Sequence, residues 1–221
     1  MSLEKLNAEV IACHKCPRLV EWREKVAREK RRAYLESEYW GKPVPGFGDP
    51  QARVFVVGLA PGAHGSNRTG RQFTGDASGN FLYPALYRAG FTNQPQADHR
   101  GDGLVLTDLY TAPVCRCAPP ENKPSQTEME NCQPFLEREL ALINPKVIVA
   151  LGRIAFDSIL RIYSVRNSGW KFAHAAQYHF QTGEWLLCSY HPSQQNTLTG
   201  RLTIPMFDDI WQTARSLITE S

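Results

Sequence analysis

The chain is 221 residues long, with 42% hydrophobic residues and a formal net charge of +3. This length and apolar content support one buried core, so we expect a single domain over residues 1–221, and the small charge excludes nucleic-acid binding driven by net charge alone. No apolar run approaches the roughly 20 residues of a membrane helix, and the first residues lack a secretory signal, so we expect a cytoplasmic protein without membrane contact. We also expect a monomer.

The N-terminal region carries two cysteines and a charged segment. Apolar residues recur at helical spacing over residues 3–11, so a short helix leads into the pair Cys13 and Cys16. Residues 21–36 mix many charged side chains with a few apolar ones, which predicts an amphipathic helix with a solvated face. Because the helix over residues 3–11 leads into Cys13 and Cys16, this cysteine pair is expected at a helix end.

A glycine-rich loop follows the first predicted strand. A buried strand is predicted over residues 53–59 from the apolar run 54–57, and residues 58–76 are crowded with glycine and small polar side chains. Glycines let backbone approach a ligand closely, and the loop offers amide donors, the ring of Phe73 and the carboxylate of Asp76. These features fit a ligand site and a tight strand-to-helix connection equally well. Asp76 is also a candidate N-cap for a helix beginning near Asn80.

Further strands, separated by helices, are predicted over residues 104–108, 147–151 and 185–190. Ser125 and Glu128 have the spacing of a capping box, which opens the helix that carries Cys132. Strands that alternate with helices indicate a three-layer α/β/α domain around a central, mainly parallel four-stranded sheet. Ligands bind beyond the carboxyl ends of such strands, so we expect the loops after the first, second and fourth strands to converge on one crevice.

Four cysteines are spaced for a metal centre. Cys13-x-x-Cys16 is followed far along the chain by Cys117 and Cys132. In a cytosolic protein, cysteines favour metal or cluster ligation over disulfides. Sites made of thiolates select zinc or an iron–sulfur cluster, and the spacing does not choose between them. Cys115 competes with Cys117 for the third position.

Two motifs and these cysteines together resemble the uracil-DNA glycosylase superfamily, and most closely its iron–sulfur branch, family 5 or type B. The motifs are the loop over residues 58–76 and the segment 189–197, which contains His191-Pro192-Ser193. The resemblance runs from Cys13 to the last helix. It implies the fold of that superfamily and a monofunctional DNA repair glycosylase. Such an enzyme flips and excises uracil, hypoxanthine and other deaminated bases from double-stranded DNA, leaving an abasic site.

The resemblance also implies a [4Fe-4S] cluster and its ligands. In families 4 and 5 the third ligand directly precedes the x-Pro-Pro sequence, and in this chain that residue is Cys117. The ligand set is then Cys13, Cys16, Cys117 and Cys132. The expected role of the cluster is structural, because it ties the N-terminal helical segment to the loop after the second strand.

The chemical roles follow from the same resemblance. His191 matches the residue that superfamily members place near O2 of the base, where negative charge develops as the bond breaks. Leu59 and Ala60 stand where many members carry a residue that activates water, and neither can transfer a proton. The resemblance therefore points to Asp76 as the carboxylate that positions water, with Asn122 as a helper.

The remaining assignments concern the base and the DNA. Phe73 is expected to stack on the flipped base, and the alternative is an ordinary core aromatic. Leu198 is a candidate wedge for the vacated stack, and a plain surface leucine is nearly as good an interpretation. The other base-binding candidates are Gly58, Ala60, Gly62, His64 and Asn196, and the other DNA-binding candidates are Arg68, Arg71 and Arg201.

Two other functions compete with the family 5 interpretation. The missing proton-transfer group at Leu59 and Ala60 motivates a noncatalytic iron–sulfur or zinc DNA-binding module. A strict family 4 type uracil enzyme is the second. Pro113 favours family 5, because it stands where family 4 enzymes carry an asparagine that reads the uracil edge. The absence of that asparagine predicts relaxed base selectivity.

Overall fold

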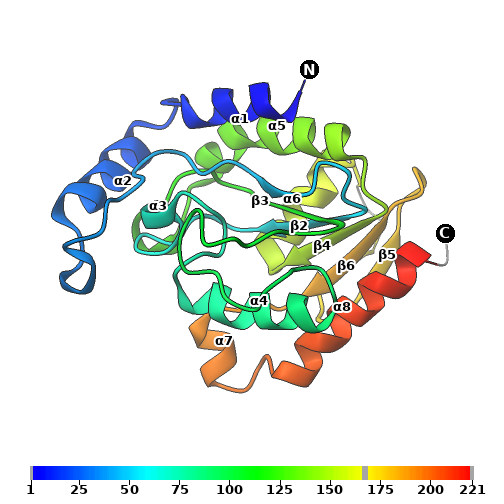
Figure 1. The fold of residues 1–221 in the computed structure, drawn as a ribbon. Coiled ribbons are helices and arrows are strands. Elements are labelled where there is room, and N and C mark those ends of the chain that lie inside the picture. The colour runs from blue at the N-terminus through cyan, green and yellow to red at the C-terminus, as the bar shows by residue number, and fades with distance from the viewer. Residues whose placement is uncertain (1, 166–168, 220–221) are drawn as a thin grey trace.

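The computed structural model describes residues 2–165 and 169–219, which fold around one sheet (Figure 1). The strands are β1 Phe47–Gly48, β2 Val54–Gly58, β3 Leu109–Pro113, β4 Val147–Leu151, β5 Gln177–His179 and β6 Trp185–Ser189. Their order across the sheet is β1-β3-β2-β4-β6-β5. β3, β2, β4 and β6 run parallel, whereas β1 and β5 pair antiparallel at the edges. The predicted class and mainly parallel sheet are confirmed, and the predicted four strands are extended by two short edge strands.

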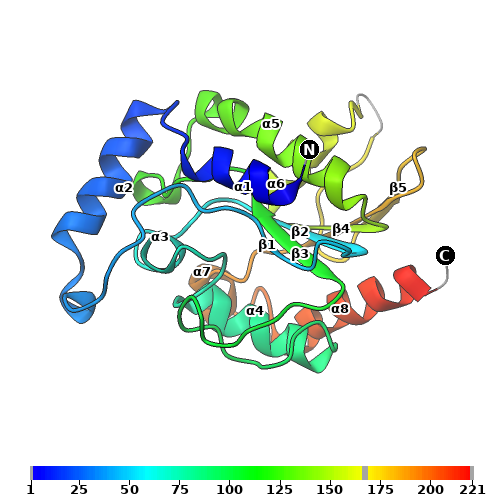
Figure 2. The ribbon, with the colours of Figure 1, turned by 45° about the horizontal axis from the view of Figure 1, so that its top comes forward.

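Helices cover both faces of the sheet (Figures 1 and 2). The helices are α1 Leu3–Ile11, α2 Pro17–Glu29, α3 Ser66–Thr69, α4 Ala77–Arg88, α5 Gln126–Ile143, α6 Arg153–Ile162, α7 Gln194–Leu198 and α8 Ile204–Thr219, with 3₁₀ turns at Arg32–Tyr34 and Pro120–Asn122. α4 and α8 pack on one face and α5 and α6 on the other, with α1 beside α5. Within the described residues, no helix combines the length and apolarity needed to cross a membrane.

The central strands are apolar on both sides because each face packs against a helical layer. In β2, Val54 and Val56 join the core that includes α4 and α8, while Phe55 and Val57 join the core that includes α5 and α6. Side chains alternate across a strand, so one continuous apolar run serves both layers. This double burial holds β2 in place and fixes where the loop after it begins.

The second parallel strand lies at residues 109–113, so the prediction of a strand at 104–108 is wrong. Asp108 has a φ of 61° and accepts hydrogen bonds from the backbone and guanidinium of Arg53, which makes a turn before β3. Leu106 is buried and forms an isolated antiparallel bridge. Leu104 and Leu106 therefore fill the core without joining the parallel sheet, while Val105 between them is exposed.

Helix boundaries depend on local caps. The charged segment predicted as a helix over 21–36 is helical through Glu29, and Lys30, with a φ of 55°, ends it. The predicted capping box is present, because Glu128 N donates to Ser125 Oγ at 3.2 Å and Ser125 N donates to Glu128 Oε2 at 2.7 Å. Caps of this kind are readable from sequence, since donor and acceptor lie within one turn.

Candidate functional site

A cavity of about 640 Å³ lies where the loops after β2, β3 and β6 meet. These loops contribute Asp76, Asn122 and His191 respectively, together with Phe73 from the first loop. All three loops follow parallel strands, and the carboxyl ends of parallel strands lie at the same edge of a sheet. The convergence predicted from strand order is confirmed, although the middle loop begins after Pro113 and not after Asp108.

Phe73 both lines the cavity and packs into the core. It is 7% exposed, and its ring centroid lies 6.1 Å from that of His191. Its φ of 50° is uncommon for a bulky residue. A Cβ on Gly58 would lie 2.8 Å from Phe73 Cζ, and a Cβ on Gly79 would lie 1.8 Å from Phe73 O. Two glycines therefore make room for a strained aromatic residue, and such strain concentrates at functional sites.

Asp76 caps a helix and also lines the cavity. Its Oδ1 accepts the backbone N–H of Gly79 at 3.0 Å, so it is the N-cap of α4, which begins at Ala77. Its Oδ2 lies against Gly65, where an added Cβ would come within 2.0 Å. Burial raises the pKa of Asp76, and the backbone hydrogen bonds at the helix start oppose that rise. A cavity carboxylate with a raised pKa is suited to accept a proton from water.

His191 lines the same cavity from the segment that follows β6. Burial lowers its pKa to about 4, although part of the residue is accessible to solvent. The imidazole is therefore neutral near pH 7 and can donate one N–H. Asn196 Nδ2 donates to His191 O at 2.9 Å. Asn196, predicted to bind the base, does not line the cavity and instead holds the backbone of His191.

The glycine-rich loop divides its predicted base-binding residues between two environments. Ala60 and Gly62 line the cavity. His64 does not, and its Nδ1 lies 2.9 Å from Tyr39 Oη, in the segment before β1. Arg68 Nε donates to His64 O at 2.8 Å, so this predicted DNA contact also braces the loop.

The prediction that Arg71 binds DNA is wrong. Arg71 is 5% exposed and donates to both carboxylate oxygens of Asp102, at 2.7 and 2.6 Å. A buried guanidinium already paired in this way cannot reach a phosphate. Two other candidates remain on the surface: Leu198 is 82% exposed at the end of α7, and exposed Arg201 lies with its guanidinium carbon 4.6 Å from the ring centroid of Tyr190.

Sequence reasoning missed several polar residues of the cavity. Gln72 is buried, and its Nε2 has no hydrogen-bond partner among residues 2–165 and 169–219. A buried amide donor without a partner is unfavourable, so a ligand or water in the cavity would stabilise it. Its position beside Phe73 was the available signal. The other polar lining residues that were given no role are Ser66, Ser78, Glu121 and Ser193.

The predicted cluster ligands lie on three segments, and three of them, Cys16, Cys117 and Cys132, share one core cluster. Cys13 and Cys16 lie in the turn between α1 and α2, Cys117 follows β3, and Cys132 is on α5. Burial is the main cause that raises the pKa of Cys117 to about 12; Arg23 opposes the rise, and the neighbouring thiols of Cys132 and Cys13 add to it. Cys115 is also close, because its thiol hydrogen-bonds with that of Cys132. In the described part of the chain, no group of three or more His, Cys, Asp or Glu residues is arranged to hold a metal ion.

Comparison with known proteins agrees with this geometry. The model of the uracil DNA glycosylase superfamily matches residues 45–215. A type-5 uracil-DNA glycosylase of Thermus thermophilus is 50% identical over 218 residues, covering 98% of this chain and 99% of that protein. The Mycobacterium leprae protein of the same name is 51% identical over 220 residues, covering 98% and 96%. A type-4 uracil-DNA glycosylase of Sulfurisphaera tokodaii is 29% identical over 209 residues, covering 89% and 80%. The chain therefore belongs to the uracil-DNA glycosylase superfamily, in its type-5 branch.

Proposed function

We propose that the protein is a DNA repair glycosylase that excises uracil from double-stranded DNA by hydrolysing the N-glycosidic bond, leaving an abasic site. The observation that carries this proposal is the meeting of Phe73, Asp76 and His191 in one cavity. Relatives that share about half of its residues are named type-5 uracil-DNA glycosylases.

Each step of the reaction has a residue in the cavity. The flipped base stacks on Phe73, which faces His191 at 6.1 Å between ring centroids. Neutral His191 donates a hydrogen bond to base O2, where charge grows as the glycosidic bond breaks. Asp76 orients water and takes its proton as the water attacks the sugar, and Asn122 also lines the cavity.

We propose that the substrates extend to hypoxanthine and other deaminated bases. Pro113 ends β3 and offers no polar side-chain group. A site that hydrogen-bonds a base edge rejects analogues strongly, whereas a site without that contact discriminates less. Without a side-chain hydrogen bond to the base edge from position 113, this protein should accept bases that a strict uracil enzyme rejects.

A duplex cleavage assay tests the function. Purified protein is incubated with labelled duplexes containing uracil, hypoxanthine or normal bases, and the products are resolved with and without alkali. For both lesions we expect the enzyme-treated strand to be cleaved only when alkali is added. A His191→Ala protein purified in parallel controls for contaminating glycosylases. No abasic product from either duplex would support the noncatalytic DNA-binding module, and release of uracil alone would support a strict uracil enzyme.

We propose further that a [4Fe-4S] cluster is held by Cys13, Cys16, Cys117 and Cys132. The cluster would have a structural role, joining the α1–α2 turn to the loop after β3 and to α5, and would not take part in catalysis. The convergence of Cys16, Cys117 and Cys132 supports these ligands, and so does buried Arg23, which places a cation 3.0 Å from Cys117 Sγ. A set of four thiolates is the donor chemistry that iron–sulfur clusters use. Cys16, Cys117 and Cys132 share a core cluster with Ala60, so the iron–sulfur cluster would also support the cavity loop.

We expect Cys117→Ser to lose bound iron and sulfide and the broad visible absorbance of a cluster, while Cys115→Ser retains them. Both thiols are buried, and the two cysteines are two residues apart in the sequence. The two substitutions should therefore disturb the fold to a similar extent. Iron and sulfide content per protein measures the outcome. The reverse pattern would assign the third ligand to Cys115.

We expect Gly65→Ala to reduce the single-turnover rate of uracil excision by about 10²-fold or more, as removal of a general base would. The added Cβ would lie 2.0 Å from Asp76 Oδ2, so the carboxylate must leave its position. Asp76→Asn in the same assay sets the loss expected when the carboxylate itself is removed. A wild-type rate in Gly65→Ala would contradict a role for the position of Asp76.

A further inference from the structure

Arg23, on α2, is a buried cation without a well-placed carboxylate partner. Its side chain is 1% exposed. Its Nη1 donates to Cys13 O at 3.3 Å and to Cys117 Sγ at 3.0 Å. Its ion-pair partner in the described residues is Glu24, whose Oε1 lies 3.8 Å from Arg23 Nη2 and whose side chain is 45% exposed. The Nε of Arg23 has no hydrogen-bond partner among the described residues. Burying a guanidinium in this way is unfavourable unless a nearby anion compensates for it.

We propose that Arg23 is the counter-charge of the cysteine-bound cluster and that it raises the reduction potential of that cluster. This inference rests on the [4Fe-4S] group proposed above. Four thiolates make such a group anionic overall, and one-electron reduction by an external reductant adds another negative charge. A cation that hydrogen-bonds to Cys117 sulfur therefore stabilises the reduced form more than the oxidised form.

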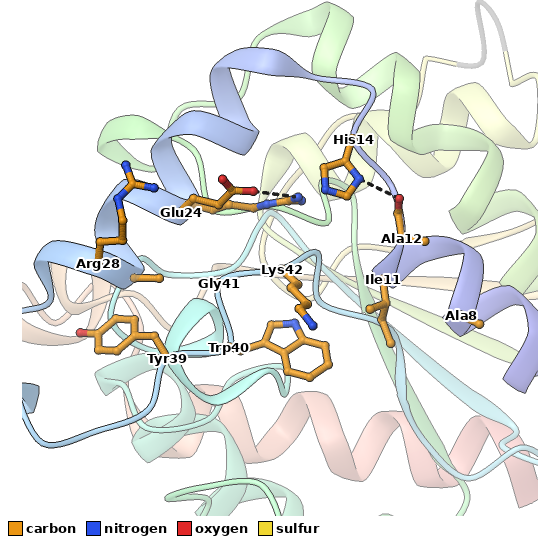
Figure 3. A pocket seen from close by; sticks show the side chains of 12 residues that line it. Ala8, Ile11, Ala12, His14, Glu24, Arg28, Tyr39, Trp40, Gly41 and Lys42 are labelled. Atoms are coloured by element: carbon orange, nitrogen blue, oxygen red, sulfur yellow. Dashed lines mark hydrogen bonds and ion pairs between the residues drawn. The ribbon is translucent and has the colours of Figure 1, made fainter.

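The surroundings of Arg23 strengthen this interaction. Arg23 lines a groove of about 730 Å³ between the end of α1, α2 and residues 39–42. Figure 3 shows Glu24 and Arg28 of α2 on one side of the groove, with Trp40 and Lys42 opposite. Arg23 is buried between this groove and Cys117, so solvent screens its charge weakly. Arg28 is exposed and lines the same groove from the same helix, which makes it a matched control.

Redox titration of the full-length, iron-loaded protein tests the proposal. The proteins compared are wild type, Arg23→Gln, Arg23→Lys and Arg28→Gln, each assayed for iron, sulfide and secondary structure. In Arg23→Gln we expect the equilibrium for reduction to weaken about tenfold or more, a shift of about 59 mV to more negative potential for a one-electron couple. Arg23→Lys keeps the charge and should lie nearer wild type, and Arg28→Gln should match wild type.

The outcomes separate the role of Arg23 from the presence of the cluster. A wild-type potential in Arg23→Gln would overturn the role of Arg23. If Arg23→Gln fails to hold iron, retention by Arg23→Lys supports the counter-charge, and equal loss in both variants overturns it. Wild-type protein that takes up no iron and sulfide on reconstitution would refute the cluster, and the role of Arg23 with it.

Discussion

His191→Ala should lower the single-turnover rate of uracil excision by about 10²- to 10³-fold, the loss typical of removing one donor to a developing anion. The donor matters most when the base carries negative charge, so the effect should appear in the rate of bond cleavage more than in DNA affinity. Single-turnover kinetics with saturating protein separates the two. His99→Ala, in an exposed loop, is the control and should keep the wild-type rate. A loss of only a few-fold in His191→Ala would contradict the assigned role.

The pH dependence follows from the lowered pKa of His191. Burial holds that pKa at about 4, below the ordinary value of 6.5, so the ring stays neutral from about pH 5 upward. The contribution of His191 to the rate should therefore be constant between pH 6 and pH 8. Below pH 6.5 the unfolded chain takes up a proton that folded His191 does not, so this residue lowers stability progressively towards pH 4. A rate that falls with an apparent pKa near 6.5, and loses that dependence in His191→Ala, would contradict this.

Asp76→Asn should lower the single-turnover rate by about 10²- to 10⁴-fold while leaving the fold stable, because an amide cannot accept the proton of water. Asparagine is as good an N-cap as aspartate, and its side-chain oxygen can accept the Gly79 N–H that Asp76 Oδ1 now accepts at 3.0 Å. Asp76→Ala loses the cap as well and should be less stable by about 1 kcal/mol. Thermal unfolding beside single-turnover rates distinguishes the chemical role from the structural one.

The pH profile gives a second test of Asp76. Burial raises its pKa, and the ionised form is the one that accepts a proton. The excision rate should therefore rise as pH increases through this raised pKa, above the ordinary value of 3.8, and then level off. Asp76→Asn should lose that rising limb. A full rate in Asp76→Asn would remove Asp76 from water activation and leave Asn122 as the remaining predicted candidate.

Local signals predicted the regular parts of the fold. The apolar runs of β2, β4 and β6 were readable because a strand buried on both faces needs no polar side chains. The middle strand was placed five residues too early, since residues 104–106 are more apolar than residues 109–113, which end in Pro113. Burial against α4 and α8 explains the earlier run, and that contact depends on the packed fold.

The sequence by itself determined the motifs that bear on chemistry, because each lies within a short stretch: the glycine loop with Phe73 and Asp76, the segment headed by His191, and the cysteine pair before α2. Tertiary structure alone decided which polar side chains are free. Arg71 is occupied by Asp102, His64 contacts Tyr39, and Arg23 is buried against Cys117. The partners in these pairs lie 25 to 94 residues apart in the chain. Such pairings depend on how distant segments pack, and residue type and local spacing carry no information about them.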